Sequence, residues 1–199
     1  MTVMTRRLAA FTLSLGLAAW GASAAAADEA VKVKFATTAG DIVVEVYPDK
    51  APKTVENFLQ YVKDKHYDGT VFHRVIDNFM VQGGGFDTKY VQKPTRAPIA
   101  HEGREALAKG GSKNVVGTLA MARTSDPHSA SSQFFINVKD NAFLDPNATQ
   151  PYGYTVFGKV ASGMDVVNKI KSVPTGPGGS FPSDVPKTPV VITSATILK

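Results

Sequence analysis

Many short apolar runs separated by turn residues constrain the fold of this chain more than any other feature. "VKVKFAT" (Val31–Thr37) alternates apolar and polar residues, as a half-buried strand does, and "DIVVEVY" (Asp41–Tyr47) follows after a short turn. Further strand-like runs are expected at Thr70–Ile76, Val116–Ala122, Gln133–Asn137, Val156–Val160 and Val190–Leu198. Loops rich in Gly, Pro, Ser, Asp and Asn separate them, a pattern that is typical of an antiparallel β-barrel or β-sandwich.

Two segments change from the two-residue period of strands to the period of a helix. The apolar residues of "APKTVENFLQYVKDK" (Ala51–Lys65) fall on one helical face: Val55, Phe58, Leu59 and Val62. "GMDVVNKIKS" (Gly163–Ser172) is the second expected helix, and the Gly- and Pro-rich segment Pro174–Pro189 is expected to be a long irregular loop. No repeat or linker divides the chain after residue 27, so a single domain at 28–199 is expected.

The first 27 residues have a different composition. Arg6 and Arg7 precede an apolar core at Leu8–Trp20, and a run of small residues ends before Asp28. This order is typical of a cleavable secretory signal peptide, and the core is short for a membrane span. A retained membrane anchor is the alternative, but no further apolar run follows Asp28. We therefore expect export to the periplasm and no membrane attachment of the remaining chain.

Charge and composition exclude several functional classes. The chain has no cysteine, which excludes disulfides, a cysteine nucleophile and a thiolate metal site. Two of its 22 basic residues and none of its 17 acidic residues lie in the first 27, so the rest carries a net charge of +3. No basic block interleaved with aromatics is present, and nucleic acid is not an expected partner. The four histidines lack metal-ligand spacing, so no metal site is expected, and without an apolar stripe a monomer is expected.

The segment "RTSDPHSASS" (Arg123–Ser132) has the composition of a hydrolase triad. Members of a Ser-His-Asp triad converge in space from separate segments, and residues this close in sequence rarely can. Asp126-Pro127 is instead typical of the start of a turn. We interpret the segment as a solvated loop.

Arg74 is the most informative single residue. It lies in "VFHRVIDNFMVQGGGF" (Val71–Phe86), which otherwise reads as buried strand, and an unpaired guanidinium is costly to bury. Arg74 is therefore either half of a structural ion pair or a cation with a chemical role. Strand alternation predicts two faces, with Phe72, Arg74 and Ile76 on one and His73 and Val75 on the other.

The residues that recur around Arg74 favour the chemical role. They permit an apolar groove with one permanent cation and an amide, formed by Gln82, Met121, Ala122, Gln133, Phe134, Phe135, Phe143 and Leu144. No nucleophile, carboxylate pair or metal is evident, but a fixed donor suffices for rotation about an X-Pro bond. When that bond twists, the prolyl nitrogen gains a localised lone pair, and a donor aimed at it stabilises the transition state.

At "FHRVIDNFMVQGG", "GTLAMAR", "SSQFFIN", "FLD" and "YTVFGKV" the chain resembles a cyclophilin-type peptidyl-prolyl cis-trans isomerase. The resemblance covers residues 31–198 and is nearest to the bacterial periplasmic branch. It implies a mainly β fold, a closed eight-stranded antiparallel β-barrel capped by two α-helices. It also implies a cofactor-free isomerase that acts on proline-containing unfolded or partly folded exported proteins, with chaperone activity as a compatible role.

The resemblance also assigns the site. Arg74 would donate to the prolyl amide, and Gln82 would orient Arg74. The proline pocket would comprise Phe79, Met80, Phe135 and Leu144, and the residues preceding proline would contact Ala122, Arg123, Thr124 and Gln133, with His73, Phe143 and Tyr154 completing the site. Arg123 replaces a common asparagine, Phe143 a tryptophan and Tyr154 a histidine, so weak cyclosporin binding is expected.

Two other functions remain open at this point. The same groove could serve a holdase or partner-recognition module that binds without turnover. Alternatively, the barrel could be a scaffold in which Arg74 only forms an ion pair.

Overall fold

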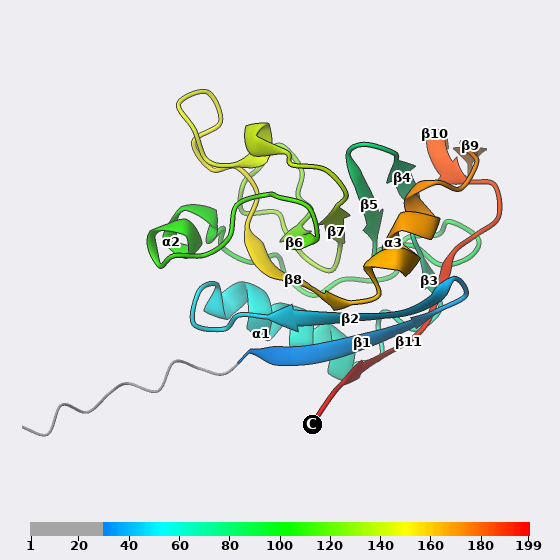
Figure 1. Ribbon diagram of the computed structural model, residues 1–199, viewed down its shortest axis with the longest axis horizontal. Coiled ribbons are helices and arrows are strands. Elements are labelled where there is room, and N and C mark those ends of the chain that lie inside the picture. The colour runs from blue at the N-terminus through cyan, green and yellow to red at the C-terminus, as the bar shows by residue number, and fades with distance from the viewer. Residues whose placement is uncertain (1–29) are drawn as a thin grey trace, which may run out of the picture.

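A computed structural model describes residues 30–199 of the protein (Figure 1), so the predicted signal peptide at 1–27 lies outside the described residues. The strands are β1 (Val31–Thr37), β2 (Gly40–Val46), β3 (Thr70–Val71), β4 (Arg74–Ile76), β5 (Met80–Gly83), β6 (Thr118–Met121), β7 (Phe134–Asn137), β8 (Val156–Ser162), β9 (Thr175–Gly178), β10 (Phe181–Pro186) and β11 (Val191–Ile197). The helices are α1 (Pro52–Lys63), α2 (Gly103–Ala108), α3 (Met164–Lys171) and the 3₁₀ turn η1 (Ala142–Leu144).

Nine strands form one curled antiparallel sheet in the order β3-β11-β1-β2-β8-β6-β7-β5-β4. The mainly β, antiparallel class is thus confirmed. The closed eight-stranded barrel is instead a nine-stranded half-barrel, because the expected strand Thr70–Ile76 breaks at Phe72 and His73. The two halves of that segment pair at opposite edges of the sheet, β3 with β11 and β4 with β5. The chain, rather than a continuous ladder, connects the two edges.

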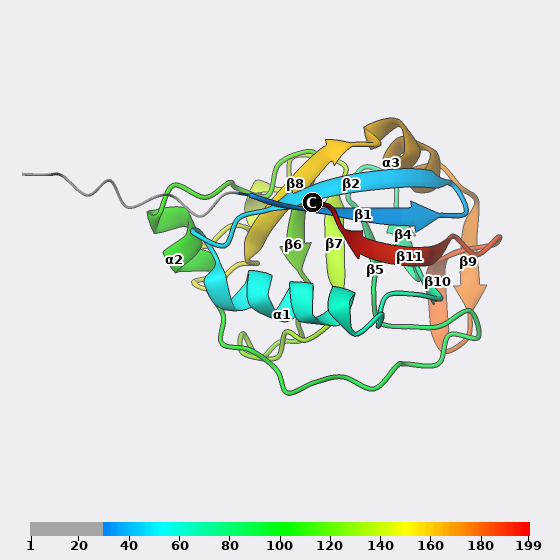
Figure 2. The ribbon, with the colours of Figure 1, turned by 90° about the horizontal axis from the view of Figure 1, so that it is seen from below.

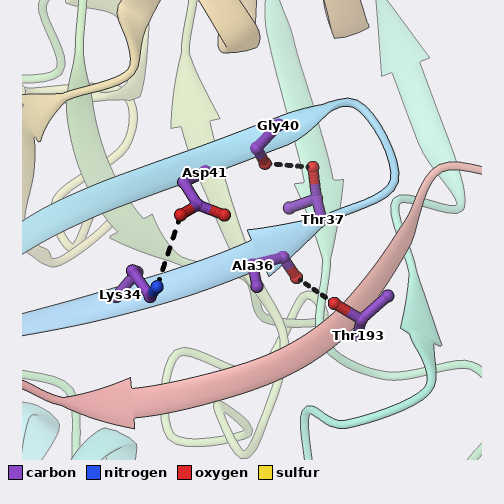
Figure 3. A network of polar contacts seen from close by, with 6 residues as sticks. All are labelled: Lys34, Ala36, Thr37, Gly40, Asp41 and Thr193. Carbon is purple, nitrogen blue, oxygen red and sulfur yellow. Dashed lines mark hydrogen bonds and ion pairs between the residues drawn. The ribbon is translucent and has the colours of Figure 1, made fainter.

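Polar side-chain contacts join the first hairpin internally and to the neighbouring strand β11 (Figure 3). The Thr37 hydroxyl donates to the Gly40 carbonyl over 2.6 Å and closes the turn between β1 and β2. Lys34 and Asp41 form an exposed ion pair across the two strands at 3.3 Å. On the other side of β1, Thr193 of β11 donates to the Ala36 carbonyl over 3.0 Å. These contacts connect the three strands, and Thr193 lies where the pairing of β1 with β11 shifts between Ala36 and Thr37.

Helices α1 and α3 occupy the two predicted helical segments and lie on opposite sides of the strands (Figure 2). Helix α1 has no capping side chain of its own at Ala51. The buried carboxylate of Glu102 supplies it, accepting from the Thr54 backbone N–H at 2.8 Å and the Thr54 hydroxyl at 2.7 Å. The short helix α2, directly after Glu102, was not predicted. Residues 30–199 therefore contain three α-helices where two were expected.

The interior of the curled sheet is filled mainly by aromatic rings. Phe134 stacks on Phe35 with ring centroids 5.2 Å apart, and it meets Phe58 edge-on at 6.1 Å. Val55 of α1 and Ile170 of α3 join the same buried cluster, so both helices are anchored to one core. Among residues 30–199, no helix is long and apolar enough to cross a membrane.

The prediction of an irregular loop at Pro174–Pro189 is wrong. The segment forms the hairpin β9–β10, in which Phe181 pairs with Gly178 and Val185 with Gly176. The hairpin packs beside β4, the edge strand that carries Arg74 (Figures 1 and 2). It therefore extends the structure next to the predicted site.

Candidate active site

The outer face of β5, β6 and β7 carries a second apolar cluster, separate from the interior. Neighbouring residues on β7 divide between the two, because strand side chains alternate: Phe134 points into the interior and Phe135 into the outer cluster. The outer cluster consists of Met80, Ala120, Phe135, Leu144 and Val156, with Ile76, Phe79, Ala122 and Tyr154 packed against it. The expectation that Met121 and Phe134 form the groove is wrong, since both are interior residues.

Arg74 lies beside this outer cluster on β4, half-buried and directly opposite Gln82 of β5. Its guanidinium carbon is 6.0 Å from the centre of the Phe79 ring, within the range of a cation–π contact. None of the ion pairs among residues 30–199 includes Arg74. The alternative that Arg74 is half of a structural ion pair is therefore not supported. Its guanidinium instead lines an open groove.

Gln82 is held in place by its own hydrogen bond rather than by Arg74. Its side-chain Nε2 donates to the side-chain Oε1 of Gln133 over 3.0 Å. Gly85 permits this arrangement, because a Cβ there would lie 2.5 Å from the Gln133 side chain. Gln82 thus lies between Arg74 and Phe135 in the ladder, with its amide fixed along the groove.

Arg123 is fixed at the Tyr154 end of the groove. Its Nε and Nη2 donate to the Gly153 carbonyl over 3.0 and 2.9 Å, and Nη1 donates to the Thr124 carbonyl over 2.8 Å. Its guanidinium lies 4.6 Å above the Tyr154 ring. Gly153 has φ of 59°, and a Cβ there would meet the backbone of Pro146, so this position requires glycine.

His73 is buried at the other end, against the rings of Phe86 and Phe181. Burial lowers its pKa to about 4, and the neighbouring charge of Arg74 acts in the same direction, so the imidazole is neutral near pH 7. The predicted alternation of this segment is wrong. Phe72 and Val75 both enter the interior, whereas His73 and Arg74 both line the groove, because the break between β3 and β4 resets the alternation.

The structure brings nearly all of the predicted site residues into one groove, with a cavity volume of about 480 Å³. Its predicted lining residues are His73, Arg74, Phe79, Met80, Gln82, Ala122, Arg123, Thr124, Gln133, Phe135, Leu144 and Tyr154. Phe143 is the exception: it is 60% exposed at the rim, where its ring stacks on Phe79 at 5.7 Å. A volume of this size suits a short peptide segment.

Sequence reasoning missed five lining residues: Phe86, Gln92, Ser129, Ser131 and Phe181. Phe86 ends the quoted "GGGF" segment and could have been included on its apolar character alone. Phe181 could not, because it belongs to the hairpin that was interpreted as a loop. Its ring contacts Phe86 edge-on with centroids 5.0 Å apart.

The Arg123–Ser132 loop contains no catalytic triad. Asp126 accepts a hydrogen bond from the backbone N–H of His128, and Ser129 donates to the Asp126 carbonyl. Both contacts are typical of a turn, and Thr124, Asp126 and His128 are exposed as in a solvated loop, whereas Ala130 and Ser132 are buried. Within residues 30–199, no three side chains of His, Asp or Glu gather as a metal site would require.

Comparison with known proteins agrees with this geometry. The family profile described as "Cyclophilin type peptidyl-prolyl cis-trans isomerase/CLD" matches residues 32–197. A peptidyl-prolyl cis-trans isomerase of Streptomyces antibioticus is 56% identical over 83% of this chain and 98% of its own length. Peptidyl-prolyl cis-trans isomerase B of Escherichia coli is 53% identical over the same shares. Peptidyl-prolyl cis-trans isomerase A of Dickeya dadantii is 48% identical over 98% of each chain.

Solved structures give the same result for the fold. A crystal structure of a Cryptosporidium parvum cyclophilin-type isomerase in the presence of the dipeptide Ala-Pro has a TM-score of 0.67 and 25% identity, and covers 84% of this chain and 99% of that one. On these matches and on the groove described above, the chain belongs to the cyclophilin-type peptidyl-prolyl cis-trans isomerase family and is an enzyme of the isomerase class.

Proposed function

We propose that the protein accelerates rotation about X-Pro bonds in exported polypeptides, and that Arg74 donates a hydrogen bond to the twisted prolyl amide. The observation that carries this proposal is a half-buried guanidinium that has no carboxylate partner among residues 30–199 and that faces an apolar groove. The groove places the donor beside Phe79 and opposite Gln82.

The energetics of the reaction suit such a site. Resonance opposes rotation with a barrier of roughly 18–20 kcal/mol, and X-Pro exchange without a catalyst takes tens to hundreds of seconds. As the bond twists, the nitrogen lone pair localises and becomes an acceptor that the planar ground state lacks. A donor aimed at it stabilises the transition state selectively. The pyrrolidine ring would occupy the pocket of Met80, Phe135 and Leu144, which excludes water from the donor.

Arg74→Ala tests the mechanism. We expect kcat/KM for a short Xaa-Pro peptide to fall about 10²–10³-fold, the typical cost of one transition-state donor. Arg74→Lys keeps the charge but loses the planar fork, and should recover only part of the activity. Arg104→Ala is the matched control, since Arg104 is exposed on α2 and does not line the groove.

Two results would contradict the mechanism. A folded Arg74→Ala variant with wild-type kcat/KM would exclude Arg74 as the donor. A wild-type protein that binds unfolded chains without accelerating X-Pro exchange would support the holdase alternative. Circular dichroism of each variant separates a lost donor from a lost fold.

The place of action follows from the proposed signal peptide at residues 1–27. The match to the Dickeya dadantii relative spans 98% of this chain and therefore extends into that segment. We expect osmotic shock to release the protein from the periplasm, and deletion of residues 2–27 to retain it in the cytoplasm. Equal release of both forms would contradict export by this segment.

Weak cyclosporin binding is also proposed. Phe143 stands at the rim of the groove without an indole N–H, and Tyr154, which packs against the outer cluster, has a phenol in place of an imidazole. Phe143→Trp should tighten cyclosporin binding measured by titration calorimetry. Tight inhibition of the unaltered protein would exclude this proposal.

A further inference from the structure

We propose that Arg123 gives the groove a preference for substrates with an acidic residue shortly before the proline. This inference rests on the proposed function, because it names the class of peptide that the same groove takes. It follows from the distribution of charge along the groove and from the way in which Arg123 is held.

The side chains that line the groove carry positive charge and no negative charge near neutral pH. Its charged lining residues are Arg74 and Arg123, and neither Asp nor Glu lines it. His73 adds no charge near neutral pH, since burial lowers its pKa to about 4. Neither guanidinium takes part in any ion pair found among residues 30–199. A carboxylate that enters the groove therefore meets positive charge only.

Within residues 30–199, the acidic side chains of the adjoining segments form no ion pair with Arg123 and accept hydrogen bonds from other groups. Asp126 follows it on the same loop, but the Asp126 carboxylate accepts from the backbone N–H of His128 at 2.8 Å. Glu102 is buried and accepts from the start of α1. Asp145 is buried and accepts from Asn114. These carboxylates are occupied by structural hydrogen bonds.

Arg123 is also fixed in a way that leaves donors for a ligand. A guanidinium carries five N–H groups. The contacts to Gly153 and Thr124 use Nε–H, one N–H of Nη2 and one of Nη1. One N–H therefore remains on each terminal nitrogen, and the stacking on Tyr154 holds the plane in place. Both remaining N–H groups can donate to a carboxylate, and little side-chain entropy is lost on binding because the guanidinium is already ordered.

The position of Arg123 selects the part of the substrate that it meets. Tyr154, above which the guanidinium lies, packs against the apolar cluster that would take the pyrrolidine ring, and Arg123 lines the groove together with Thr124 and Gln133. By family resemblance this stretch binds residues that precede proline. An acidic side chain one to three residues before proline is therefore the proposed recognition feature.

The test is a series of proline peptides with a single Glu at the first, second or third position before proline, each matched to the same peptide with Gln. We expect kcat/KM for the Glu peptide to exceed that for the Gln peptide by about tenfold at one position, equivalent to about 1.4 kcal/mol. The ratio should shrink as salt is raised, because the site is partly exposed. Arg123→Gln, which can still donate to Gly153, should bring the ratio close to one.

Two controls separate local contact from overall charge. Arg104→Gln removes one positive charge from an exposed position outside the groove and should leave the Glu/Gln ratio as in the wild type. Arg123→Lys keeps the charge and should retain part of the preference. Equilibrium binding of the same peptides, measured by fluorescence anisotropy, gives the preference independently of turnover.

A Glu/Gln ratio near one at all three positions would overturn the inference, as would a ratio that Arg123→Gln leaves unchanged. Failure of the proposed function has a different signature, since the protein would then accelerate no peptide at all. In that case the anisotropy measurements alone would decide whether the acidic preference exists.

Discussion

The two faces of the curled sheet are both apolar, but they differ in the interactions that stabilise the side chains on them. On the inner face, Phe134 touches the rings of Phe35, Phe58, Tyr67 and Phe72, with centroid distances of 5.2 to 6.3 Å. On the outer face, its neighbour Phe135 touches one other ring among residues 30–199, that of Tyr154. The inner face is filled by packing, whereas the outer face is left open as a groove.

Hydrogen bonds supplement apolar packing on the outer face. Asn141 donates to the Phe79 carbonyl over 2.9 Å, and the Tyr154 N–H donates to the Leu144 carbonyl over 2.9 Å. Asn141 is itself joined to Asn137, within a buried network that reaches Asp145. Directional contacts can hold a pocket wall without filling the pocket, whereas apolar packing would close it. The difference explains how one strand can serve both a core and a binding site.

The sharpest test of this difference compares two single variants, Phe134→Ala and Phe135→Ala. Loss of the interior ring should lower the free energy of unfolding by about 3–5 kcal/mol, the usual cost of a large cavity. Phe135→Ala should cost less stability, since its ring borders the open groove, but should reduce kcat/KM far more per folded molecule. Urea denaturation and peptide assays measure the two quantities. Equal stability losses would break the distinction between the faces.

The pKa of His73 can be used to test whether water is excluded from its part of the groove as it is from the interior. Its pKa is about 4 in the folded state against an ordinary value of 6.5, so between these two pH values the unfolded state binds more protons. Stability should therefore be unaffected by this group above pH 6.5, and should fall by about 3 kcal/mol as pH drops to 4.

His73→Gln should flatten that part of the pH profile, measured by denaturation at each pH. His66 and His101 also have pKa values lowered by burial, and their contribution remains in the variant. An unchanged profile would mean that His73 is hydrated in solution and that the groove is wet at this end.

Asn141→Ala tests whether hydrogen bonds shape the outer face. The buried partners Asn137 and the Phe79 carbonyl lose a donor, so the free energy of unfolding should fall by about 1–3 kcal/mol. Because the wall that carries Phe79 loses a support, KM should also rise. Asn147→Ala is the matched control: Asn147 is exposed and makes its contacts within its own loop. Equal effects from both variants would argue against a special role for the network.

The inner face was easier to predict from sequence than the outer. Alternation alone locates β1 and β2, and helical periodicity locates α1 within two residues at each end. The break at Phe72 and His73 leaves no signal, because both residues are buried like their strand neighbours and only the tertiary path separates β3 from β4.

The groove residues depended on the resemblance to a family, because periodicity does not reveal which apolar residues border a cavity. Phe134 and Phe135 are adjacent and of the same residue type, so the sequence does not show which of the two faces the groove. The pairing of β7 with its neighbours decides this. The hairpin β9–β10 stayed hidden because its strands contain Gly and Pro at positions where a strand pattern needs apolar residues. Its contribution to the groove rests on one aromatic ring.

That ring, Phe181, gives the smallest predicted effect. It packs on Phe86 and His73 and lines the groove together with Arg74. Phe181→Ala removes an aromatic contact of about 0.5–1.5 kcal/mol, so KM should rise a few-fold while kcat changes little. Phe181→Leu should recover much of the loss if bulk is what matters. Steady-state kinetics with a peptide extended on both sides of proline measure the effect, and a dipeptide-length substrate serves as the control. If both substrates respond alike, the hairpin supports the fold of β4 and does not itself contact the substrate.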